Sequence, residues 1–446
     1  MDQNILKFYH KGSDIMDIPN EYFQQYDVKK GLRNEDGTGV RVGLTKIADV
    51  VGYAYADGKK VDAAGQLYYR GIEISDLIHG RYVHDHVFAF EETCFLLLFG
   101  YLPTAEELEI FMKVLQSQYE LPDQFLETAI LQMPSGNLMN QLQQAVLSLY
   151  DFDEAADDNS IANTLRQGLS IIARLPSILC YAYHSMAHHF ERASLHIHYP
   201  QSHYGMAENI LHMLRADSRF TPQEAKILDL MLVLHADHGG GNNSTFTNVV
   251  VASTGTDIYS AVAASIGSLK GPRHGGANLQ VCNMMNEVIE QIGLDGDDER
   301  IRQVQKQLLH KEFYDRSGLI YGMGHAIYTK SDPRAELLKE HLAQLAIEKH
   351  EEKRLAFYQR FEANAKELIR KEKGVGVSAN VDFYSGLVYD MLHIPHDLFT
   401  PLFVCARMVG WLAHNIENKL YDGRIMRPAT KYVGTLQEYI PIEKRK

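Results

Sequence analysis

Residues 322–335 read GMGHAIYTKSDPRA, and this stretch carries the most specific pattern in the chain. Its glycines predict a loop in which the backbone approaches a ligand closely, with His325 on that loop. Asp332 and Pro333 predict the start of a helix, because aspartate is a favoured N-cap residue and proline is favoured in the first turn. The helix dipole opposes the cation of Arg334 at that helix start. We therefore expect the guanidinium to face a carboxylate, either from a ligand or in an ordinary salt bridge.

Two further glycine-bordered segments each carry one acid–base group. In GPRHGGAN (residues 271–278), the start of the following helix is expected to lower the pKa of His274 and keep it neutral. A neutral imidazole can still donate a hydrogen bond to a developing oxyanion; the alternative is a plain turn residue. In NVDFYSG (residues 380–386), Asp382 is either an ordinary N-cap or, if buried among aromatic rings, a carboxyl with a raised pKa and a usable base.

The sequence LHADHGGG places His235 and His238 at the end of a predicted helix. The negative end of the helix dipole favours imidazolium there, which suits the binding of an anion. A metal site with Asp237 is a second interpretation, although no third ligand follows at a familiar spacing. The third interpretation is a hydrogen-bonded histidine of the core.

Helix signals dominate the chain after about residue 80 and predict a mainly α fold. Capping boxes begin at Thr104 and Thr221, and Asp257 is positioned to cap an Ala/Gly/Ser-rich helix over 258–269. Pro401 is expected to open the last long helix, which carries Arg407. The first 75 residues have imperfect apolar alternation, which predicts short hairpins rather than a sheet core. The charged stretch 339–373 is typical of a solvated helix pair.

Composition argues against a binder of nucleic acid or of anionic membranes, and it leaves small anionic ligands possible. The chain has 446 residues, 45% apolar content and a net charge of −13. That charge disfavours nucleic acid and anionic membranes, while a few arginines in one site still bind a small anion. The four cysteines are far apart, and the first residues resemble neither a secretory signal nor a mitochondrial presequence. We therefore expect a cytoplasmic protein without a disulfide framework.

These segments, taken together, closely resemble the citrate synthase family. GMGHAIYTKSDPR is similar to the family's longest signature, and HADHGGGNNS, GPRHGGAN, NVDFYSG and ARMVGW match its other motifs in the right order. The resemblance implies a citrate synthase-like, two-domain helical fold and a homodimer. It places the large domain at residues 1–277 together with 385–446, and a small domain, which closes over the substrates, at 278–384.

The resemblance also implies the catalytic roles. His274 would hydrogen-bond the thioester carbonyl of acetyl-CoA while Asp382 removes a methyl proton. His325 would polarise the keto oxygen of oxaloacetate and protonate it as the carbon–carbon bond forms. Ser244 matches the position that orients the first catalytic histidine. The reaction needs no metal and no redox cofactor.

Binding residues are carried over from the family in the same way. The positions that match oxaloacetate ligands are His238, Arg334, Arg407 and Arg427, with Arg427 expected to reach across from the second subunit. Lys330 and Lys373 are expected near the phosphates of CoA. Gly239 stands where the family commonly has glutamate, and Thr329 stands where many relatives have a basic residue.

Three alternatives remain open from the sequence. A 2-methylcitrate synthase shares every catalytic motif and differs only in accepting one more methylene, a difference of about 1–3 kcal/mol. A non-catalytic helical ligand-binding scaffold would need the arginines but not the base. A metal hydrolase built on HADH would bind stoichiometric zinc.

Overall fold

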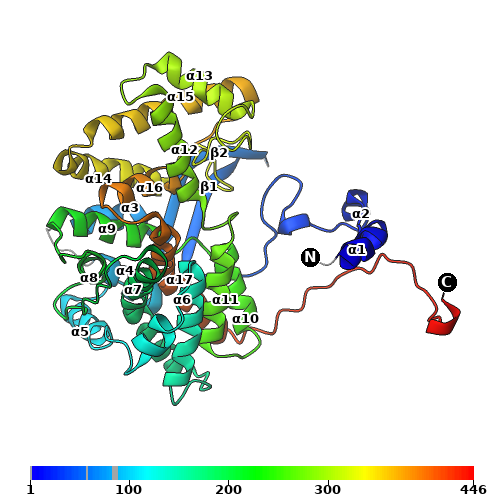
Figure 1. Cartoon of the computed structure of the whole chain (residues 1–446), viewed down its shortest axis with the longest axis horizontal. Coiled ribbons are helices and arrows are strands. Elements are labelled where there is room, and N and C mark those ends of the chain that lie inside the picture. The colour runs from blue at the N-terminus through cyan, green and yellow to red at the C-terminus, as the bar shows by residue number, and fades with distance from the viewer. Residues whose placement is uncertain (1–2, 57–58, 83–88, 446) are drawn as a thin grey trace. The chain divides into compact units, whose positions relative to one another are not determined.

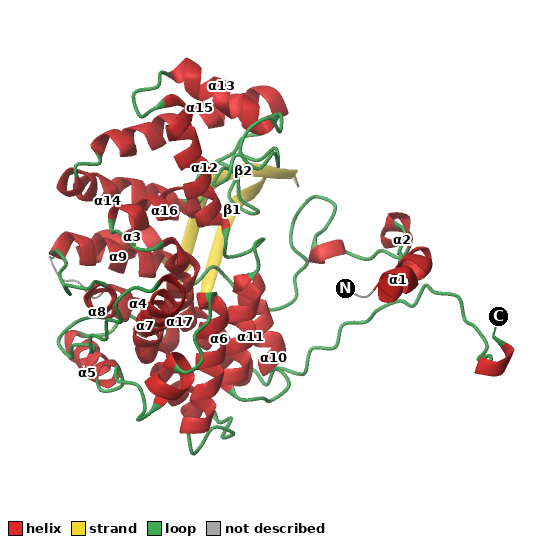
Figure 2. Cartoon of the chain, in the orientation of Figure 1, coloured by secondary structure: helices red, strands yellow, loops and turns green. Residues whose placement is uncertain are grey.

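The computed structural model describes residues 3–56, 59–82 and 89–445 of the chain. These residues form two compact units. The core unit comprises residues 43–425, and the terminal unit comprises residues 1–42 and 426–446. Figure 1 follows the chain through both units, and Figure 2 shows that helices make up most of the core unit. The prediction of a mainly α fold is confirmed.

One small antiparallel sheet contains the strands of the described chain, in the order β1-β2-β3. Its strands are β1 (Ala48–Ala56), β2 (Lys59–Tyr69) and β3 (Ile72–Glu73). The register between β1 and β2 shifts between Val51 and Tyr53, which marks a bulge. The prediction of short N-terminal hairpins is therefore confirmed.

Helices supply the rest of the core unit. Their bounds are α3 (Ile74–Tyr82), α4 (Ala89–Phe99), α5 (Ala105–Gln116), α6 (Leu138–Ser148), α7 (Ile161–Glu191), α8 (Met206–Leu214), α9 (Pro222–His235), α10 (Asn243–Ala252), α11 (Ile258–Lys270), α12 (Ala277–Ile292), α13 (Asp298–Leu309), α14 (Pro333–Lys349), α15 (Glu352–Lys373), α16 (Val381–Met391) and α17 (Phe399–Leu420). Figure 1 shows α12–α16 gathered at one end of this unit. Within the described ranges, no helix combines the length and the apolar character that crossing a bilayer requires.

Local capping signals set the helix starts as the sequence predicted. Thr104 and Thr221 each form a capping box with the glutamate three residues later. The side chain of Asp257 accepts a hydrogen bond from the backbone N–H of Ser260 at the start of α11. The last helix differs, because α17 begins at Phe399, two residues before Pro401. Proline fits there because the first-turn N–H groups of a helix have no partner within it.

The helices α7 and α17 pack against each other in the middle of the hydrophobic core. Their contact is close because Gly168 of α7 faces Leu412 of α17. A methyl group added at Gly168 would lie 2.3 Å from the side chain of Leu412, which is fully buried. This packing fixes α17, whose buried residues include Arg407 and Trp411. The core thus fixes the position of the helix that carries the buried charge of Arg407.

The charged stretch 339–373 forms the helix pair α14 and α15, as predicted, but the expectation of a solvated pair is wrong. Each helix buries an apolar stripe, with Leu342 and Leu345 on α14 and Phe357 and Phe361 on α15. Charged residues dominate the composition because they fill the outer faces of both helices. The few apolar residues recur at helical spacing and reach the core.

The terminal unit contains the helices α1 (Gln3–Met16) and α2 (Asn20–Gln25) and a C-terminal segment with one short 3₁₀ turn, η5 (Ile442–Lys444). Between residue 426 and this turn, the C-terminal segment has no helix or strand. Large apolar side chains are exposed along it, namely Tyr432, Leu436, Tyr439, Ile440 and Ile442. Exposed apolar side chains gathered in one segment are typical of an interaction site.

We predict that Gly168→Ala lowers the thermal midpoint of unfolding. The added methyl group overpacks the α7–α17 contact, which costs about 1–3 kcal/mol. The matched control is Gly80→Ala on α3, where an added methyl group meets nothing within 4 Å. Differential scanning fluorimetry measures the thermal midpoint of unfolding of both variants. Equal midpoints for the two variants would contradict the close packing at Gly168.

Candidate active site

Two loops that are far apart in sequence pair with each other and bring His325 close to the start of α16. The backbone N–H of Gly324 donates to the carbonyl of Ser378 at 2.7 Å, and the N–H of Asn380 donates to the carbonyl of Gly322 at 2.9 Å. The side-chain amide of Asn380 adds a third bond, to the carbonyl of Gly324, at 2.9 Å. Gly322 has a φ of 80°, and a Cβ there would lie 2.8 Å from the Phe383 ring. Only glycine fits this crossing.

The backbone fixes which nitrogen of His325 carries the proton. The N–H groups of Ile327 and Tyr328 both point at Nδ1, at 3.0 Å and 3.1 Å. Since both groups can only donate, Nδ1 is the acceptor and the neutral ring has its proton on Nε2. The ring also stacks on Tyr328, with 4.7 Å between centroids. His325 is thus held as a hydrogen-bond donor of defined direction.

Asp332 joins the helix that carries Arg334 to the helix that carries Asp382. Its side chain accepts from the backbone N–H of Arg334 at 3.0 Å, which caps α14. It also accepts from Nε and Nη2 of Arg334, at 3.0 Å and 2.8 Å, and from the N–H of Val381 at 3.2 Å. The carboxylate expected opposite Arg334 is therefore found within the chain. Burial alone would lower the pKa of Arg334, but the charge of Asp332 raises it.

Asp382 lies in the first turn of α16, and the interpretation of this residue as an ordinary N-cap is wrong. Asn380 is the cap, because its side chain accepts from the backbone N–H of Asp382 at 3.0 Å. Desolvation by the surrounding side chains raises the pKa of Asp382 to about 6, against the opposing charges of Arg334 and Arg407. The predicted raised pKa is confirmed. Such a carboxylate is ionised at neutral pH and more basic than an exposed one.

Ser244 holds the ring of His274. The backbone N–H of Ser244 points at Nε2 of His274 at 3.4 Å, and its hydroxyl lies 3.2 Å from the same nitrogen. That hydroxyl donates to Asn242 at 2.9 Å and accepts from the indole N–H of Trp411 at 3.2 Å. Because the backbone N–H can only donate, Nε2 is unprotonated and Nδ1 carries the proton. Burial, and then Arg407, lower the pKa of His274 to about 4, so the predicted neutral ring is confirmed.

Arg407 is a fully buried cation with unused hydrogen-bond donors. Its Nε donates to the carbonyl of His235 at 2.7 Å, and its guanidinium lies over the Phe403 ring at 4.7 Å. Nη1 and Nη2 are buried and have no hydrogen-bond partner among the described residues. Burial lowers the pKa of Arg407 to about 10, partly offset by Asp237. Unpaired buried donors are costly, so this pair of nitrogens is suited to a ligand carboxylate.

The expectation that His235 or His238 is an imidazolium is wrong. Burial lowers the pKa of His235 to about 3 and that of His238 well below its usual value, and the charges of Arg334 and Arg407 add to both shifts. Desolvation and two nearby cations outweigh the helix dipole. Each ring has a protein neighbour: Nδ1 of His235 contacts the Met231 carbonyl at 2.8 Å, and Nε2 of His238 lies 3.3 Å from the Tyr328 hydroxyl.

The carboxylate of Asp237, which the metal interpretation of HADH requires as a ligand, already has partners within the chain. Oδ2 of Asp237 lies 3.3 Å from Nε2 of His414 and accepts from the N–H of Gly239 at 2.9 Å. Burial would raise the pKa of Asp237, but His414 and then Arg407 lower it. Asp237 is therefore a buried carboxylate that contacts His414 and interacts with the charge of Arg407.

Three further residues predicted to bind substrate, Lys330, Lys373 and Arg427, are exposed. Lys330 is exposed on the loop before α14, and Lys373 is exposed at the last position of α15. Arg427 is exposed and belongs to the terminal unit.

Electrostatic interactions with Arg407 bring Asp382, His274 and His238 together in one region. Arg407 lowers the pKa of Asp382, of His274 and of His238, so its charge reaches all three. The rings of His238 and His325 lie 5.3 Å apart in a T-shaped arrangement. One base, two oriented neutral imidazoles and two arginines can bind a dicarboxylate, remove a proton from carbon and stabilise an oxyanion.

Comparison with known proteins agrees with this chemistry. The family model described as Citrate synthase, C-terminal domain, matches residues 36–429. The chain belongs to the citrate synthase family. A citrate synthase of Haloferax volcanii is 34% identical over 94% of this chain and 99% of its own length. The 2-methylcitrate synthase 2 of Corynebacterium glutamicum is 31% identical over 92% of this chain and 98% of its own length.

A solved structure extends the likeness to three dimensions. The citrate synthase of Thermoplasma acidophilum, in a ternary complex with carboxymethyl coenzyme A and oxaloacetate, is 26% identical, with a TM-score of 0.76 over 94% of this chain and 99% of that chain. The citrate synthase-like helical fold expected from the sequence is thereby confirmed.

Several residues that build the site were missed in the sequence. Asp332 was noted only as a helix start, although an aspartate two positions before an arginine at a helix start can cap the helix and pair with the arginine at once. Tyr328 and Asn380 gave no signal of their own, because their partners lie on other loops. The contact of Trp411 with Ser244 depends on tertiary packing, because the two residues are far apart in sequence.

We predict that Asp382→Asn makes the protein relatively more stable as the pH rises. A carboxyl whose folded-state pKa lies above the ordinary 3.8 stabilises the fold fully below pH 3.8, and this contribution is lost as the pH rises through about 6. Asparagine does not titrate. The difference in thermal midpoint, variant minus wild type, should therefore increase between pH 4 and pH 7. A constant difference across this range would contradict the raised pKa.

Proposed function

We propose that this enzyme condenses acetyl-CoA with oxaloacetate and hydrolyses the resulting citryl-CoA to citrate and CoA. The observation that carries the proposal is a carboxylate of raised pKa, Asp382, within the electrostatic reach of a buried arginine with two unpaired nitrogens. A carboxylate of this kind is suited to remove a proton from carbon, and the arginine is suited to bind a substrate carboxylate. The ternary complex of the Thermoplasma relative, which holds a CoA derivative and oxaloacetate, supports the choice of substrates.

In the first step, the carboxylate of Asp382 removes a proton from the methyl group of acetyl-CoA. The electron pair of the broken C–H bond moves toward the thioester oxygen, which accepts a hydrogen bond from Nδ1–H of His274. Ser244 supports this role because its backbone N–H faces Nε2 and leaves the proton on the opposite nitrogen. A neutral donor opposite a desolvated base favours an enol over a free enolate.

In the second step, the enol carbon attacks the keto carbon of oxaloacetate. The keto oxygen gains negative charge and takes a proton from Nε2–H of His325. The two backbone N–H groups at Nδ1 support this direction of transfer, because they hold the proton on Nε2 before the reaction. Water then cleaves the thioester C–S bond of citryl-CoA and releases the CoA thiol.

Oxaloacetate binding is assigned to Arg407, Arg334 and His238, together with Arg427. Nη1 and Nη2 of Arg407 are suited to a bidentate contact with one carboxylate. Arg334 is already paired with Asp332, so it contributes positive charge that is fixed in place rather than a free fork. His238 is neutral and contributes a hydrogen bond through its ring. The exposed Lys330 and Lys373 are assigned to the phosphates of CoA.

A homodimer is proposed as the working form, with Arg427 supplied by the second subunit. The exposed apolar side chains of the C-terminal segment support a partner surface for this part of the chain. Arg427 lies within the same segment, so a partner that covers it would also receive the arginine. The second copy of the chain is the partner that the family resemblance implies.

Two domains are proposed within each subunit, with residues 278–384 closing over the substrates. The contacts of α13 with α15 and of α14 and α12 with α16 support a small helical domain. Its boundaries lie in the first turns of α12 and α16, next to His274 and Asp382. Closure would then move Asp382 and Arg334 relative to His274. A closed site also excludes water from the enol.

The proposal is tested by release of free CoA thiol from acetyl-CoA and from propionyl-CoA, with and without oxaloacetate. Rapid release that requires oxaloacetate and prefers acetyl-CoA supports citrate synthase. The likeness to 2-methylcitrate synthases makes that activity the second candidate, which a preference for propionyl-CoA would support. No release from folded protein would leave only the scaffold alternative.

We predict that kcat/KM for acetyl-CoA falls as the pH drops through about 6, because the base must be ionised.

Asp382→Asn should lower kcat by about 10²–10⁴-fold, the usual contribution of a positioned base, while oxaloacetate binding is retained. Stopped-flow measurement of thiol release gives kcat, and isothermal titration calorimetry gives the affinity for oxaloacetate. Normal turnover by Asp382→Asn would remove this residue from the role of base.

We predict that two inactive variants restore each other in mixed dimers. In a dimer of Asp382→Asn with Arg427→Leu, one site combines the intact Asp382 of one subunit with the intact Arg427 of the other, and the second site lacks both. Refolding the mixture from denaturant should recover activity absent from either variant alone. No recovery, from mixtures shown to contain mixed dimers, would place Arg427 in the site of its own subunit.

A further inference from the structure

A cluster of two histidines and one glutamate lies outside the residues assigned to catalysis. His79 comes from α3, and Glu340 and His341 come from α14, which packs against α3. One possible ligand atom from each side chain lies within 4.8 Å of the other two. Nε2 of His79 is 3.2 Å from Oε1 of Glu340 and 3.3 Å from Oε2. Among the described residues, these three form the one group of this kind.

We propose that His79, Glu340 and His341 bind a divalent transition metal ion, with Zn²⁺ as the best fit. Two imidazoles and one carboxylate are a common zinc ligand set, and a water molecule completes the tetrahedron. Metal–ligand bonds of about 2.1 Å place neighbouring ligand atoms about 3.4 Å apart. The His79–Glu340 pair already has this spacing, so only His341 must approach further.

The surroundings of the cluster suit a nitrogen-preferring metal. Glu340 and His341 line a cavity of about 160 Å³ together with Lys226 and other residues of α9 and α14, which leaves room for the water ligand. One carboxylate among the three side chains provides too few oxygen ligands for Mg²⁺ or Ca²⁺, which depend on several, whereas two imidazoles suit Zn²⁺.

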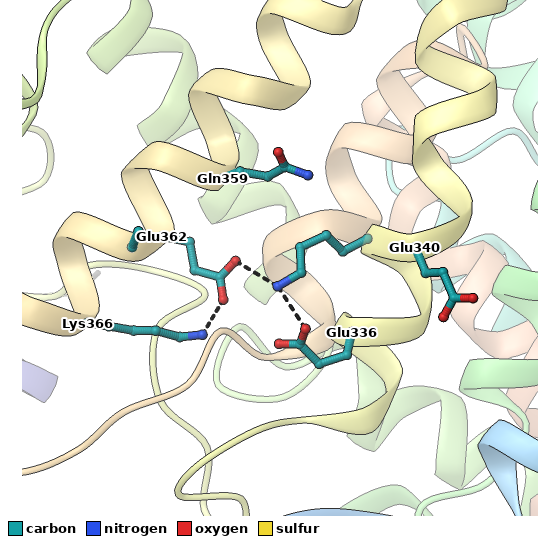
Figure 3. A pocket seen from close by; sticks show the side chains of 7 residues that line it. Glu336, Glu340, Gln359, Glu362 and Lys366 are labelled. Atoms are coloured by element: carbon teal, nitrogen blue, oxygen red, sulfur yellow. Dashed lines mark hydrogen bonds and ion pairs between the residues drawn. The ribbon is translucent and has the colours of Figure 1, made fainter.

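Glu340 is also separate from the ion pairs of the neighbouring groove. There Lys339 pairs with Glu336 and Glu362, and Lys366 pairs with Glu362. Figure 3 shows the carboxylate of Glu340 at the edge of this groove, directed away from the pairs that Glu362 makes. The protein contact of Glu340 is His79 on the other helix. Its carboxylate is thus directed to the position that the metal would take.

A metal ion here would link two parts of the chain, and this consequence rests on the proposed function. α3 belongs to the proposed large domain, and α14 belongs to the proposed small domain and carries Arg334 in its first turn. A coordinate bond between the two helices would hold α14 in one position relative to α3. Zn²⁺ should therefore slow turnover, and a chelator should reverse the effect.

The first test measures Zn²⁺ binding to the full-length chain, without substrates, after removal of metal with EDTA. Isothermal titration calorimetry should give one ion per chain, and Co²⁺ in its place should give the visible absorption of a tetrahedral site. His79→Ala and His341→Ala should each weaken binding at least tenfold. Glu340→Gln, which keeps the shape of the side chain, should also weaken it. Circular dichroism verifies that each variant is folded.

His310→Ala is the matched control. His310 also pairs with a glutamate, Glu372, at 3.5 Å, but the described residues give that pair no second imidazole. Zn²⁺ affinity should be unchanged in this variant. Failure to bind Zn²⁺ saturably, or binding that survives His79→Ala or is lost only in His238→Ala, would overturn the metal site.

Turnover is measured separately, so that the two proposals can fail independently. Zn²⁺ should slow CoA release by the wild type, but not by His79→Ala. Equal inhibition of both would overturn the bridge between α3 and α14. Absence of CoA release altogether would reject the proposed function, while the binding measurements on the same protein still decide the metal site.

Discussion

The buried guanidinium of Arg407 is the constraint on which the site depends. It lies on α17 in the middle of the core, held through Nε by the carbonyl of His235, with two nitrogens that no described residue bonds. A buried charge without full compensation destabilises a fold, because the charge has lost its hydration. A bound ligand carboxylate would offset this destabilisation, because it would pair with the two free nitrogens. The same cation helps to keep His238 and His274 neutral and opposes the raised pKa of Asp382.

Backbone groups, more than side chains, set the direction of proton transfer in this account. The N–H groups of Ile327 and Tyr328 fix the proton of His325 on Nε2, and the N–H of Ser244 fixes that of His274 on Nδ1. Backbone donors cannot change protonation state, so the fold itself fixes which nitrogen of each neutral imidazole donates. The titrating group is then Asp382, and the pH dependence of turnover should follow that carboxyl.

The sequence predicted the fold class and the chemistry of the site from patterns that are local. Capping boxes, proline at helix starts and glycine-bordered motifs depend on residues a few positions apart, and the structure confirms the helices they predicted. Predictions failed where tertiary surroundings decide the outcome. The helix dipole argued for a charged His235 and His238, but burial beside two arginines makes both neutral. Asp382 was weighed as a cap, and the loop pairing places Asn380 there instead.

The most direct test of this account compares oxaloacetate binding and thermal stability in Arg407→Met. Calorimetry and scanning fluorimetry on the same samples provide both quantities. If the two unpaired nitrogens serve a ligand carboxylate, the variant should lose oxaloacetate binding while its thermal midpoint stays the same or rises, since a buried charge is replaced by an apolar chain of similar length. Undiminished oxaloacetate binding by folded Arg407→Met would contradict the central role assigned to this arginine.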